Sequence, residues 1–422
     1  MTTAQWLGVG IFVLTYGFII TERMHRLKAV FLGFSLVLLF HVIRQEEIFT
    51  YIDFNTIGLL LGMMILVGIV MKTGLIEYVA SEAVRYSKGN AWVLLLFLSG
   101  LTAAASAFID NVTTILLIGP IAMAVADVLE ISPMPFLYAE IFASNIGGTA
   151  TLIGDPPNLL IGSAAGFTFN EFLINLGPPV ILSLAVLFVL LYIWYGKKLR
   201  GAPEGEWSFR EPRKPADKSL TIRVLFVLAL VLAGFLLHGR LHLEAATVAL
   251  AGATLGLIVC PVDVEDVLHH VDWVTILFFS TLFMLVGTLE HLGVIHMLAQ
   301  NMFAVVGDHF RILSMLLIWA SGGISAVIDN VPYTAAVIPL VREVAQIGGF
   351  DATPLWWSLA LGACLGGNGT LVGASANLVM AGIAGKSGVK INFRKFLVRG
   401  MTVMTATLAV STIYVYFRYL ML

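Results

Sequence analysis

Charged residues are scarce in this sequence. They make up 12% of the 422 residues, against roughly 25% in soluble globular proteins, while apolar residues make up 59%. This composition excludes a soluble protein and predicts a chain of membrane-spanning helices, so the lipid bilayer is its first expected partner. The 24 basic residues are balanced by 26 acidic ones, which leaves no basic excess to bind nucleic acid.

Cysteine is nearly absent as well. Cys260 and Cys364 are too few and too far apart for a disulfide framework or a thiolate metal cluster. We expect both to pack as small apolar residues. The histidines predict no metal site either, because no cysteine or carboxylate set completes a coordination shell around His238 and His242 or around His291 and His296.

Nucleotide-binding motifs are also missing. The sequence contains neither a G-x-x-x-x-G-K-[ST] loop nor a dinucleotide fingerprint. No pattern pairs a nucleophile with a base, so we predict no catalytic residue. We therefore predict a secondary transporter that needs no cofactor and uses the proton motive force. A membrane-embedded enzyme or a structural subunit is the alternative from a different class.

Long apolar runs are what the chain does contain. Windows of about 17–25 apolar residues indicate membrane-spanning helices. The first window has no basic n-region or cleavage pattern before it, so we predict a retained helix there. Two longer apolar regions, 91–166 and 310–385, are interrupted by Gly, Pro, Asn and Asp, which membrane depth tolerates only where the backbone lines a cavity or is buried in protein. The windows are 4–20, 28–43, 55–72, 174–195, 222–238, 244–261, 273–290 and 401–419.

An internal repeat organises these runs. Chance similarity between apolar helices would not keep one register through rare Asp, Asn, Gly and Pro positions. We therefore predict two duplicated halves, residues 1–200 and 222–422, joined by a polar cytoplasmic linker at 201–221. A constant offset of 219 residues, without a gap, pairs Asp53 with Asp272, Thr56 with Thr275, Asp110-Asn111 with Asp329-Asn330, Pro120 with Pro339, Gly147-Gly148 with Gly366-Gly367, and Asn158 with Asn377.

Loop charge predicts how the two halves face. If each half has five spans and one re-entrant hairpin, an N-terminus outside the cell places 19 Lys and Arg residues inside and 5 outside. An odd number of spans inverts the second half and leaves the C-terminus outside too. The predicted fold is an all-α polytopic membrane protein with about ten transmembrane helices and two re-entrant hairpins. Its two inverted-topology repeats would place broken helices at the midplane.

The hairpin tips carry the first candidate site. Asp110 and Asp329 each lie beside an asparagine in an apolar run, where an uncompensated Asp costs roughly 2.5–3.5 kcal/mol to insert. Desolvation favours the protonated carboxyl, which suits proton coupling. Capping of the following helix is a compatible structural role. Asn111, Asn330 and Thr113 add donors and acceptors for a small hydroxylated or hydrated ligand.

A second constellation lies in the interrupted regions. Glycines and the Pro156-Pro157 pair must break a helix there, and the break exposes oriented backbone groups that can hold a polar ligand or ion. A kink without a ligand is the alternative. Glu140, also in an apolar run, is either a further proton-coupling residue or a buried hydrogen-bonding group. The candidate binding residues are Asn145, Gly148, Thr149, Thr151, Asp155, Asn158, Asn368, Thr370, Ser375 and Asn377.

These motifs resemble the ion transporter superfamily, and within it the ArsB/NhaD-type permeases, over nearly the whole chain. The matching stretches are the two Asp-Asn tips and the runs at 147–158 and 366–377. Dicarboxylate carriers of the superfamily usually have Ser-Asn-Thr at the tips. The Asp-Asn-Val of this chain argues against a dicarboxylate, because it places negative charge where the substrate would bind.

Among these permeases the chain is most similar to bacterial arsenite efflux permeases. That resemblance implies the bacterial inner membrane, export of trivalent arsenite or antimonite in exchange for protons, and an optional cytoplasmic arsenite-stimulated ATPase as a partner. The substrate would be the neutral trihydroxide, held by Asn, Thr and backbone groups, because two lone cysteines do not support thiolate binding of As(III). A sodium/proton antiporter of the same superfamily is the alternative, since paired Asp residues suit a cation equally well.

Overall fold

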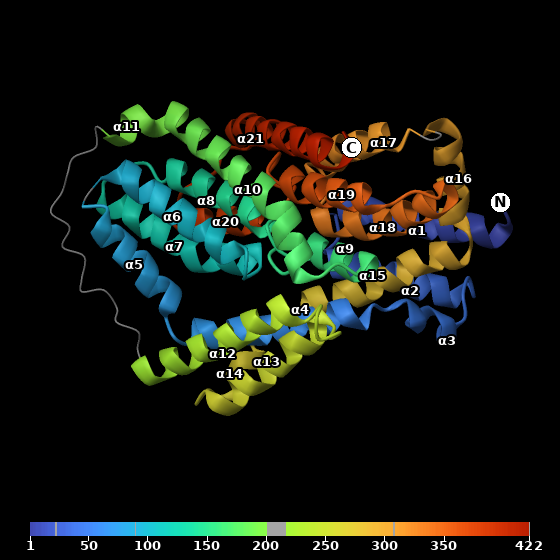
Figure 1. The fold of residues 1–422 in the computed structure, drawn as a ribbon, viewed down its shortest axis with the longest axis horizontal. Coiled ribbons are helices and arrows are strands. Elements are labelled where there is room, and N and C mark those ends of the chain that lie inside the picture. Colours follow the sequence, from blue (N-terminus) through green and yellow to red (C-terminus); the bar gives the residue numbers. More distant parts are fainter. Residues whose placement is uncertain (22, 89, 201–216, 307–308, 422) are drawn as a thin grey trace.

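The described part of the chain is helical throughout. The computed structural model describes residues 1–21, 23–88, 90–200, 217–306 and 309–421, and every regular element in these ranges is a helix (Figure 1). Residues 201–216 of the predicted linker therefore lie outside the described ranges. Residues 218–221, at the end of the predicted linker, form the first turn of a helix. The all-α prediction is confirmed.

The helices fall into two series. The first contains α1 (Thr3–Thr21), α2 (Arg26–Leu39), α3 (Gln45–Ile48), η1 (Phe49–Tyr51), α4 (Phe54–Met71), α5 (Leu75–Tyr86), α6 (Ala91–Ser106), α7 (Asn111–Val128), α8 (Met134–Gly148), α9 (Pro156–Ala165), α10 (Phe169–Leu191), η2 (Tyr192–Gly196) and α11 (Lys197–Arg200). The second contains α12 (Lys218–Leu237), α13 (Ala245–Val259), α14 (Val264–Leu268), α15 (Trp273–His291), α16 (Val294–Val306), α17 (Phe310–Ser325), α18 (Asn330–Gly348), α19 (Thr353–Gly366), α20 (Ser375–Lys386), α21 (Phe393–Val415) and η3 (Tyr416–Leu420).

Each predicted apolar window contains a helix. Within the described ranges, seven helical stretches are long and apolar enough to cross a membrane, beginning in α1, α4, α7, α10, α12, α15 and α21. Helices α6, α13 and α17 are apolar but shorter. The windows at 174–195 and 401–419 were too short, because α10 and α21 contain polar residues in their first turns. Thr168 forms a capping box with Glu171 before α10, and Asn392 caps α21.

The helix boundaries follow the predicted register. Eight consecutive helices, from α2 to α9, begin 219 residues before their counterparts, α13 to α20. The register then changes, because six residues separate α20 from α21 whereas three separate α9 from α10. Helix α10 and its counterpart α21 are consequently offset by 224 residues.

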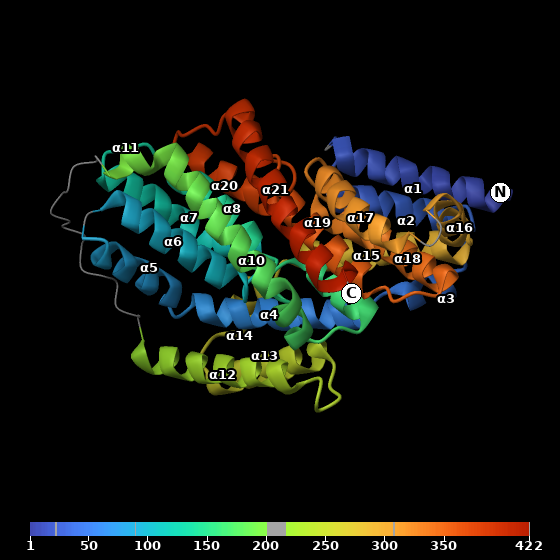
Figure 2. The same ribbon diagram turned by 45° about the horizontal axis from the view of Figure 1, so that its top comes forward.

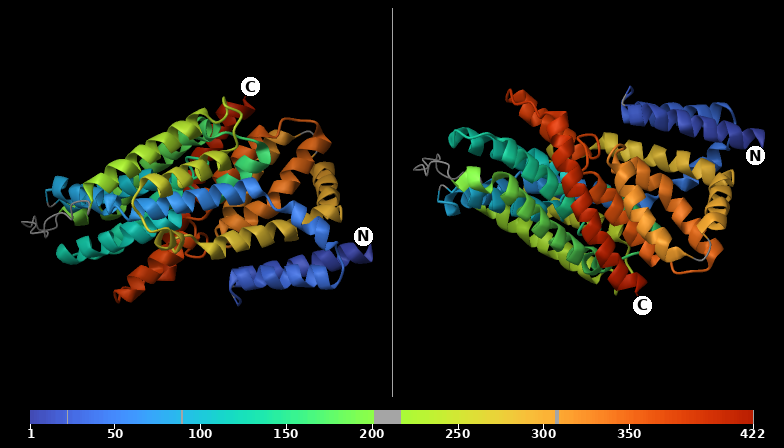
Figure 3. Two further views of the ribbon diagram at one scale, coloured as in Figure 1. Left: turned by 90° about the horizontal axis from the view of Figure 1, so that it is seen from below. Right: turned by 90° about the horizontal axis from the view of Figure 1, so that it is seen from above.

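Equivalent helices occupy opposite ends of the molecule. Helices α5 to α8 gather at one end, and α16 to α18 at the other, in both views of Figures 1 and 2. Helix α21 crosses between these groups, as the view from above in Figure 3 shows. The long helices exchange partners between the series, since α4 packs on α13 and its counterpart α15 packs on α2.

The chain is broken between α8 and α9, at residues 149–155, and between α19 and α20, at residues 367–374. Small residues allow α8 and α19, the helices before these breaks, to pack closely on the hairpins formed by α6–α7 and α17–α18. A Cβ on Gly147 of α8 would lie 2.2 Å from the Ala103 carbonyl oxygen of α6. In the second series, a Cβ on Gly366 of α19 would lie 2.6 Å from the Gly322 carbonyl oxygen of α17. Close approach through small residues is how membrane helices gain packing contacts when lipid removes the hydrophobic driving force.

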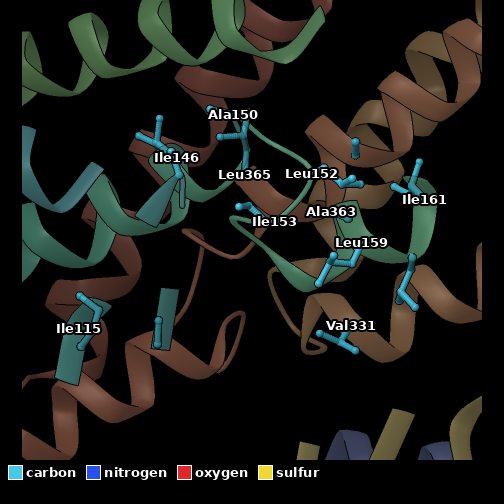
Figure 4. Packing of buried hydrophobic residues seen from close by; sticks show 14 of the residues in the cluster. Ile115, Ile146, Ala150, Leu152, Ile153, Leu159, Ile161, Val331, Ala363 and Leu365 are labelled. Atoms are coloured by element: carbon cyan, nitrogen blue, oxygen red, sulfur yellow. The ribbon is translucent and has the colours of Figure 1, made fainter. Parts of the chain in front are cut away.

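The breaks themselves lie in the buried core. Figure 4 shows Leu152, Ile153 and Leu159 around the first break, with Ala363 and Leu365 of α19 in the same region. All five belong to one buried hydrophobic cluster that contains residues of both series. The irregular backbone of the first break is therefore enclosed by protein, as membrane depth requires.

We predict that Gly147→Ala destabilises the protein by about 1–3 kcal/mol, because the added methyl group forces α8 away from α6. Gly100→Ala on α6 is the matched control. Its Cβ would meet no atom within 4 Å, and alanine is the better helix former, so this variant should be neutral or stabilising. Thermal unfolding of the purified proteins in detergent measures both. Equal midpoints for the two variants would contradict the packing argument.

Candidate substrate-binding cavity

Each hairpin turns at an aspartate that caps the following helix. The Asp110 carboxylate accepts a hydrogen bond of 2.9 Å from the Thr113 N–H at the start of α7. The Asp329 carboxylate accepts one of 3.1 Å from the Val331 N–H at the start of α18. The capping role expected for these residues is therefore present in both hairpins. One oxygen of each carboxylate lies outside this capping bond and can take a second partner.

Asparagine side chains form hydrogen bonds to the backbone of the two breaks. The Asn158 amide donates to the carbonyl oxygens of Thr149 (3.0 Å) and Thr151 (2.8 Å). Its counterpart Asn377 donates to the carbonyl oxygens of Gly367 and Thr370, both at 2.8 Å. These bonds satisfy carbonyl groups that an unbroken helix would have paired internally. The amide donors of both asparagines are thus committed to the backbone.

Threonines fasten the breaks to the hairpin tips. The Thr151 hydroxyl donates to the Ala107 carbonyl oxygen, and the Thr370 hydroxyl donates to the Ala326 carbonyl oxygen. Each acceptor lies three residues before a tip aspartate. A tip and a break in the same series are therefore held together as one unit.

The two breaks are also joined to each other. The Asn145 amide of α8 donates to the Asn377 side-chain oxygen at 3.0 Å and to that of Asn368 at 3.1 Å. Residue 364 occupies the equivalent position on α19, and its thiol donates to the Asn158 side-chain oxygen at 3.5 Å. Cys364 is buried as predicted, but it is a hydrogen-bond donor in this network as well as a packing residue.

A cavity of about 380 Å³ lies where the two hairpin tips approach each other. Residues of α2, α4, α7, α9, α15, α18 and α20 line it, so both series contribute. Its charged lining consists of one guanidinium, from Arg26, and four carboxylates, from Asp110, Asp155, Asp272 and Asp329. The cavity is therefore rich in acidic groups and poor in basic ones.

Asp155 makes the two halves of the cavity unequal. It is 1% exposed, and both of its carboxylate oxygens lie 3.2 Å from the Asn330 amide nitrogen. Although it precedes α9, its side chain forms no capping hydrogen bond. The equivalent position in the second series is Ala374, so the second half contributes no matching carboxylate. Among the described residues, the side-chain amide of Asn111, the counterpart of Asn330, contacts the Asn145 side-chain oxygen at 3.5 Å and no carboxylate.

Arg26 adds a second asymmetry. Its guanidinium lies 3.4 Å from the Asp329 carboxylate and donates to the hydroxyls of Ser375 (3.1 Å) and Thr275 (3.3 Å). It also lies over the Phe278 ring, 5.4 Å from the centroid. No guanidinium occupies the equivalent position in the second series, which is Ala245. Asp329 therefore has an arginine partner, whereas Asp110 has its capping hydrogen bond but no cationic partner among the described residues.

The structure places the sequence-predicted residues in three groups. Seven line the cavity: Asp110, Asn111, Thr113, Asp155, Asp329, Asn330 and Ser375. Eight lie behind it in the breaks and the asparagine network: Asn145, Gly148, Thr149, Thr151, Asn158, Asn368, Thr370 and Asn377. Glu140 lies apart from the cavity, buried between α8 and α6, where it accepts a hydrogen bond from Thr102. The roles of all these residues in substrate or proton binding remain predictions.

Four polar residues of the cavity lining were missed by sequence reasoning: Arg26, His270, Asp272 and Thr275. Arg26 was counted only as a loop charge, since nothing in the sequence relates it to the hairpin tips. Asp272 and Thr275 gave a usable signal, because both recur in the other half as Asp53 and Thr56. The Asp272 carboxylate caps α15 and accepts a bond of 2.5 Å from the Thr275 hydroxyl.

A family model described as citrate transporter (CitMHS) matches residues 16–362. The chain belongs to the citrate transporter family. An uncharacterized transporter of Mycobacterium tuberculosis is 40% identical over 424 residues, covering 99% of both chains. A 46 kDa membrane protein of Mycobacterium leprae is also 40% identical, over 425 residues and with the same coverage. The human P protein is 33% identical over 500 residues, which include 98% of this chain and 60% of the P protein.

A solved structure shares the fold. The crystal structure of the YdaH transporter of Alcanivorax borkumensis, described as having an unusual topology, superposes with a TM-score of 0.64 over 97% of this chain and 96% of that chain. The identity of 14% limits this likeness to the fold. The predicted superfamily is confirmed. This member of the citrate transporter family is a multi-pass membrane protein and a secondary transporter, and it is not an enzyme.

We predict that Asn330→Ala lowers the free energy of unfolding by about 1–3 kcal/mol, because it removes the amide that contacts the buried Asp155 carboxylate. Asn111→Ala, at the equivalent position, removes only a long amide–amide contact and should cost less. Thermal unfolding in detergent compares the two variants. A larger loss for Asn111→Ala would contradict the asymmetry of the cavity.

Proposed function

We propose that this member of the citrate transporter family is a proton-coupled antiporter that binds a small cation in the cavity between the hairpin tips. The observation that carries the proposal is the lining of that cavity, where four carboxylates face a single guanidinium. Acidic residues at membrane depth are characteristic of cation pathways and proton relays.

Competition for the same carboxylates supplies the coupling. Asp110 and Asp155 form no ion pair within the described ranges, so each can be neutralised by a proton or by a bound cation. Occupancy by one ligand then disfavours the other, and the two cross the membrane in opposite directions. Asp110, Asp329 and, away from the cavity, Glu140 are our candidates for proton binding.

The charge of the cavity argues against a free polycarboxylate. The family is named for citrate, whose carboxylates would meet four carboxylates and one guanidinium here. Like charges disfavour such a ligand by several kcal/mol in a partly buried site. Citrate would need protons or a cation bound with it to occupy this cavity.

Arsenite or antimonite in the neutral trihydroxide form is the second candidate substrate. The observation that favours it is the ring of hydrogen-bonding side chains in the cavity, namely Asn111, Asn330, Thr113 and Ser375. These groups can donate to and accept from three hydroxyls without a charge. The resemblance to arsenite permeases adds export from the bacterial cytoplasm and an arsenite-stimulated ATPase as an optional partner.

The transport cycle would use the two halves of the chain. We propose inverted repeats at 1–200 and 222–422, with both termini outside the bacterial inner membrane and the linker at 201–221 in the cytoplasm. Each tip and its break, fastened by Thr151 or Thr370, would move together against the remaining spans.

Transport in everted membrane vesicles tests the function. Sodium-dependent dequenching of a pH dye reports cation antiport, and As(III) uptake under an imposed pH gradient reports the second candidate. Whichever substrate is transported, we predict that its flux is at least about tenfold lower in the double variant Asp110→Asn/Asp329→Asn, because neither tip can then exchange a proton for a cation.

The matched control is Asp127→Asn, an exposed aspartate at the far end of α7. It should transport at the native rate. Unchanged flux in the double variant would refute the coupling role of the tips. If the native protein transports neither sodium nor As(III), both candidate substrates are refuted.

We also predict that Arg26→Gln lowers the half-saturating sodium concentration about fivefold, because it frees Asp329 from its positive partner. Lys28→Gln, an exposed charge on the same helix α2, should leave this concentration unchanged. The same vesicle assay measures both. A weaker sodium affinity in Arg26→Gln would show that Arg26 supports cation binding rather than opposing it.

A further inference from the structure

A second cavity has the opposite charge. It has a volume of about 610 Å³ and lies among α8, the η2–α11 segment and the start of α21. We call it the basic pocket, after its five cationic lining residues, Lys198, Lys390, Arg394, Lys395 and Arg399. No described residue in its lining is acidic, and none of the five cations forms an ion pair within the described ranges.

In this pocket the protein fixes the position of one cation, Arg399, and buries one hydroxyl, that of Tyr195. The Arg399 guanidinium lies 5.1 Å from the Tyr138 ring centroid and 5.0 Å from that of Tyr195. These contacts fix its position without neutralising its charge. Tyr195 is 7% exposed, and its hydroxyl has no hydrogen-bond partner in the described part of the chain. A buried hydroxyl without a partner is costly unless a ligand or water satisfies it.

The internal repeat provides a control for this arrangement. At the 224-residue offset of α10 and α21, Tyr195 corresponds to Tyr419, and Arg399 corresponds to Asn175. There the Tyr419 hydroxyl donates to the Asn175 side-chain oxygen and is satisfied within the protein. Arg394 and Lys395 correspond to Asn170 and Glu171. The packing of α10 on α21 therefore does not require basic residues. The cluster of cations occurs at the Tyr195 end of this helix pair and not at the equivalent Tyr419 end.

The pocket lies at the end of a membrane-spanning helix pair. Helices α10 and α21 pack antiparallel, since Asn175 contacts Arg418 (3.3 Å) at one end and Tyr195 contacts Arg399 at the other. The twenty residue steps from Asn175 to Tyr195 span about 30 Å of helix, which matches the hydrocarbon thickness of a bilayer. The basic pocket is therefore placed at the depth of lipid headgroups.

Apolar surface adjoins the cations. Val398 lines the pocket and is 64% exposed, and Ile193 on the neighbouring η2 turn is 69% exposed. An apolar groove of about 920 Å³ also runs between α10 and α21, from Leu182 to Leu190 on the first helix. The helix pair thus offers a cationic pocket and a lipid-facing groove for apolar chains.

We propose that the basic pocket binds the phosphate headgroup of an anionic phospholipid, whose acyl chains lie along α10 and α21. Arginine and lysine supply the positive charge, and the Tyr195 hydroxyl donates to a phosphate oxygen. The lipid links α8, α10 and α21, so its binding stabilises the folded protein. The adjoining apolar surface favours a phospholipid over a soluble phosphate.

The test compares ligands on the purified protein in detergent. Phosphatidylglycerol should raise the thermal unfolding midpoint, whereas phosphatidylcholine should not, because only ligands that bind the folded state stabilise it. Native mass spectrometry should count one retained phosphatidylglycerol. In the variant Arg394→Gln/Lys395→Gln, which changes two exposed side chains and leaves Arg399 in place, the lipid affinity should fall at least about tenfold.

The control variant is Lys218→Gln/Arg223→Gln, which removes two exposed charges at the start of α12 and should bind the lipid normally. Inorganic phosphate and glycerol 1-phosphate form the soluble arm. Equal protection by either of these would overturn the lipid assignment in favour of a soluble phosphate. Equal protection by phosphatidylcholine, or an unchanged response in Arg394→Gln/Lys395→Gln, would overturn the pocket itself. Neither outcome bears on sodium or arsenite transport.

Discussion

Two helices are broken inside a membrane protein, and the rest of the structure depends on how their freed backbone groups are paired. Water cannot satisfy those groups at membrane depth, so side chains must. Asn158 and Asn377 donate to the carbonyl oxygens of their own breaks, while Asn145 and Cys364 reach across to the break of the other series. Because each break is completed by the other half, the two series form one core rather than two adjacent bundles.

The two helix series are nearly symmetric, but the cavity between them is not. The tip aspartates, their neighbouring asparagines and the fastening threonines recur in both halves. Arg26 and Asp155 do not recur, and both act on the second hairpin, through Asp329 and Asn330 respectively. A symmetric pair of sites would bind two equal ligands. The observed lining instead provides one half-neutralised tip, Asp329, and one open tip, Asp110, so a cation and a proton compete for two unequal carboxylates.

The hairpin tips and the helix breaks could be predicted from the sequence because rare residues mark them at a fixed offset. Asp110, Asp329, Asn158 and Asn377 are costly in apolar surroundings, so their recurrence at one offset is informative. Helices α5 and α16 were missed because both lie between the long apolar windows and mix polar with apolar residues. The offset change before α21 was missed because it lies in a loop, where no rare residue marks the register.

Part of the site was beyond sequence reasoning for a different reason. Whether an asparagine faces a ligand or a carbonyl group depends on the backbone path, and Asn158 and Asn145 proved to face the protein. Arg26 lies 303 residues from Asp329, and no repeated position relates the two. Contacts between non-equivalent positions of the two helix series leave no signal in a repeated sequence register. The asymmetry that distinguishes this cavity was therefore the least predictable of its features.

Proton release on ligand binding tests the central claim most directly, because it measures competition without transport. The purified protein in weakly buffered detergent solution would receive sodium chloride, then arsenite in a separate sample, with choline chloride as the ionic-strength control. If substrate and protons share the carboxylates of the cavity, one of the two ligands releases protons, and the release is lost in Asp110→Asn/Asp329→Asn. A saturable binding of either ligand with no proton release beyond the choline control would contradict the account.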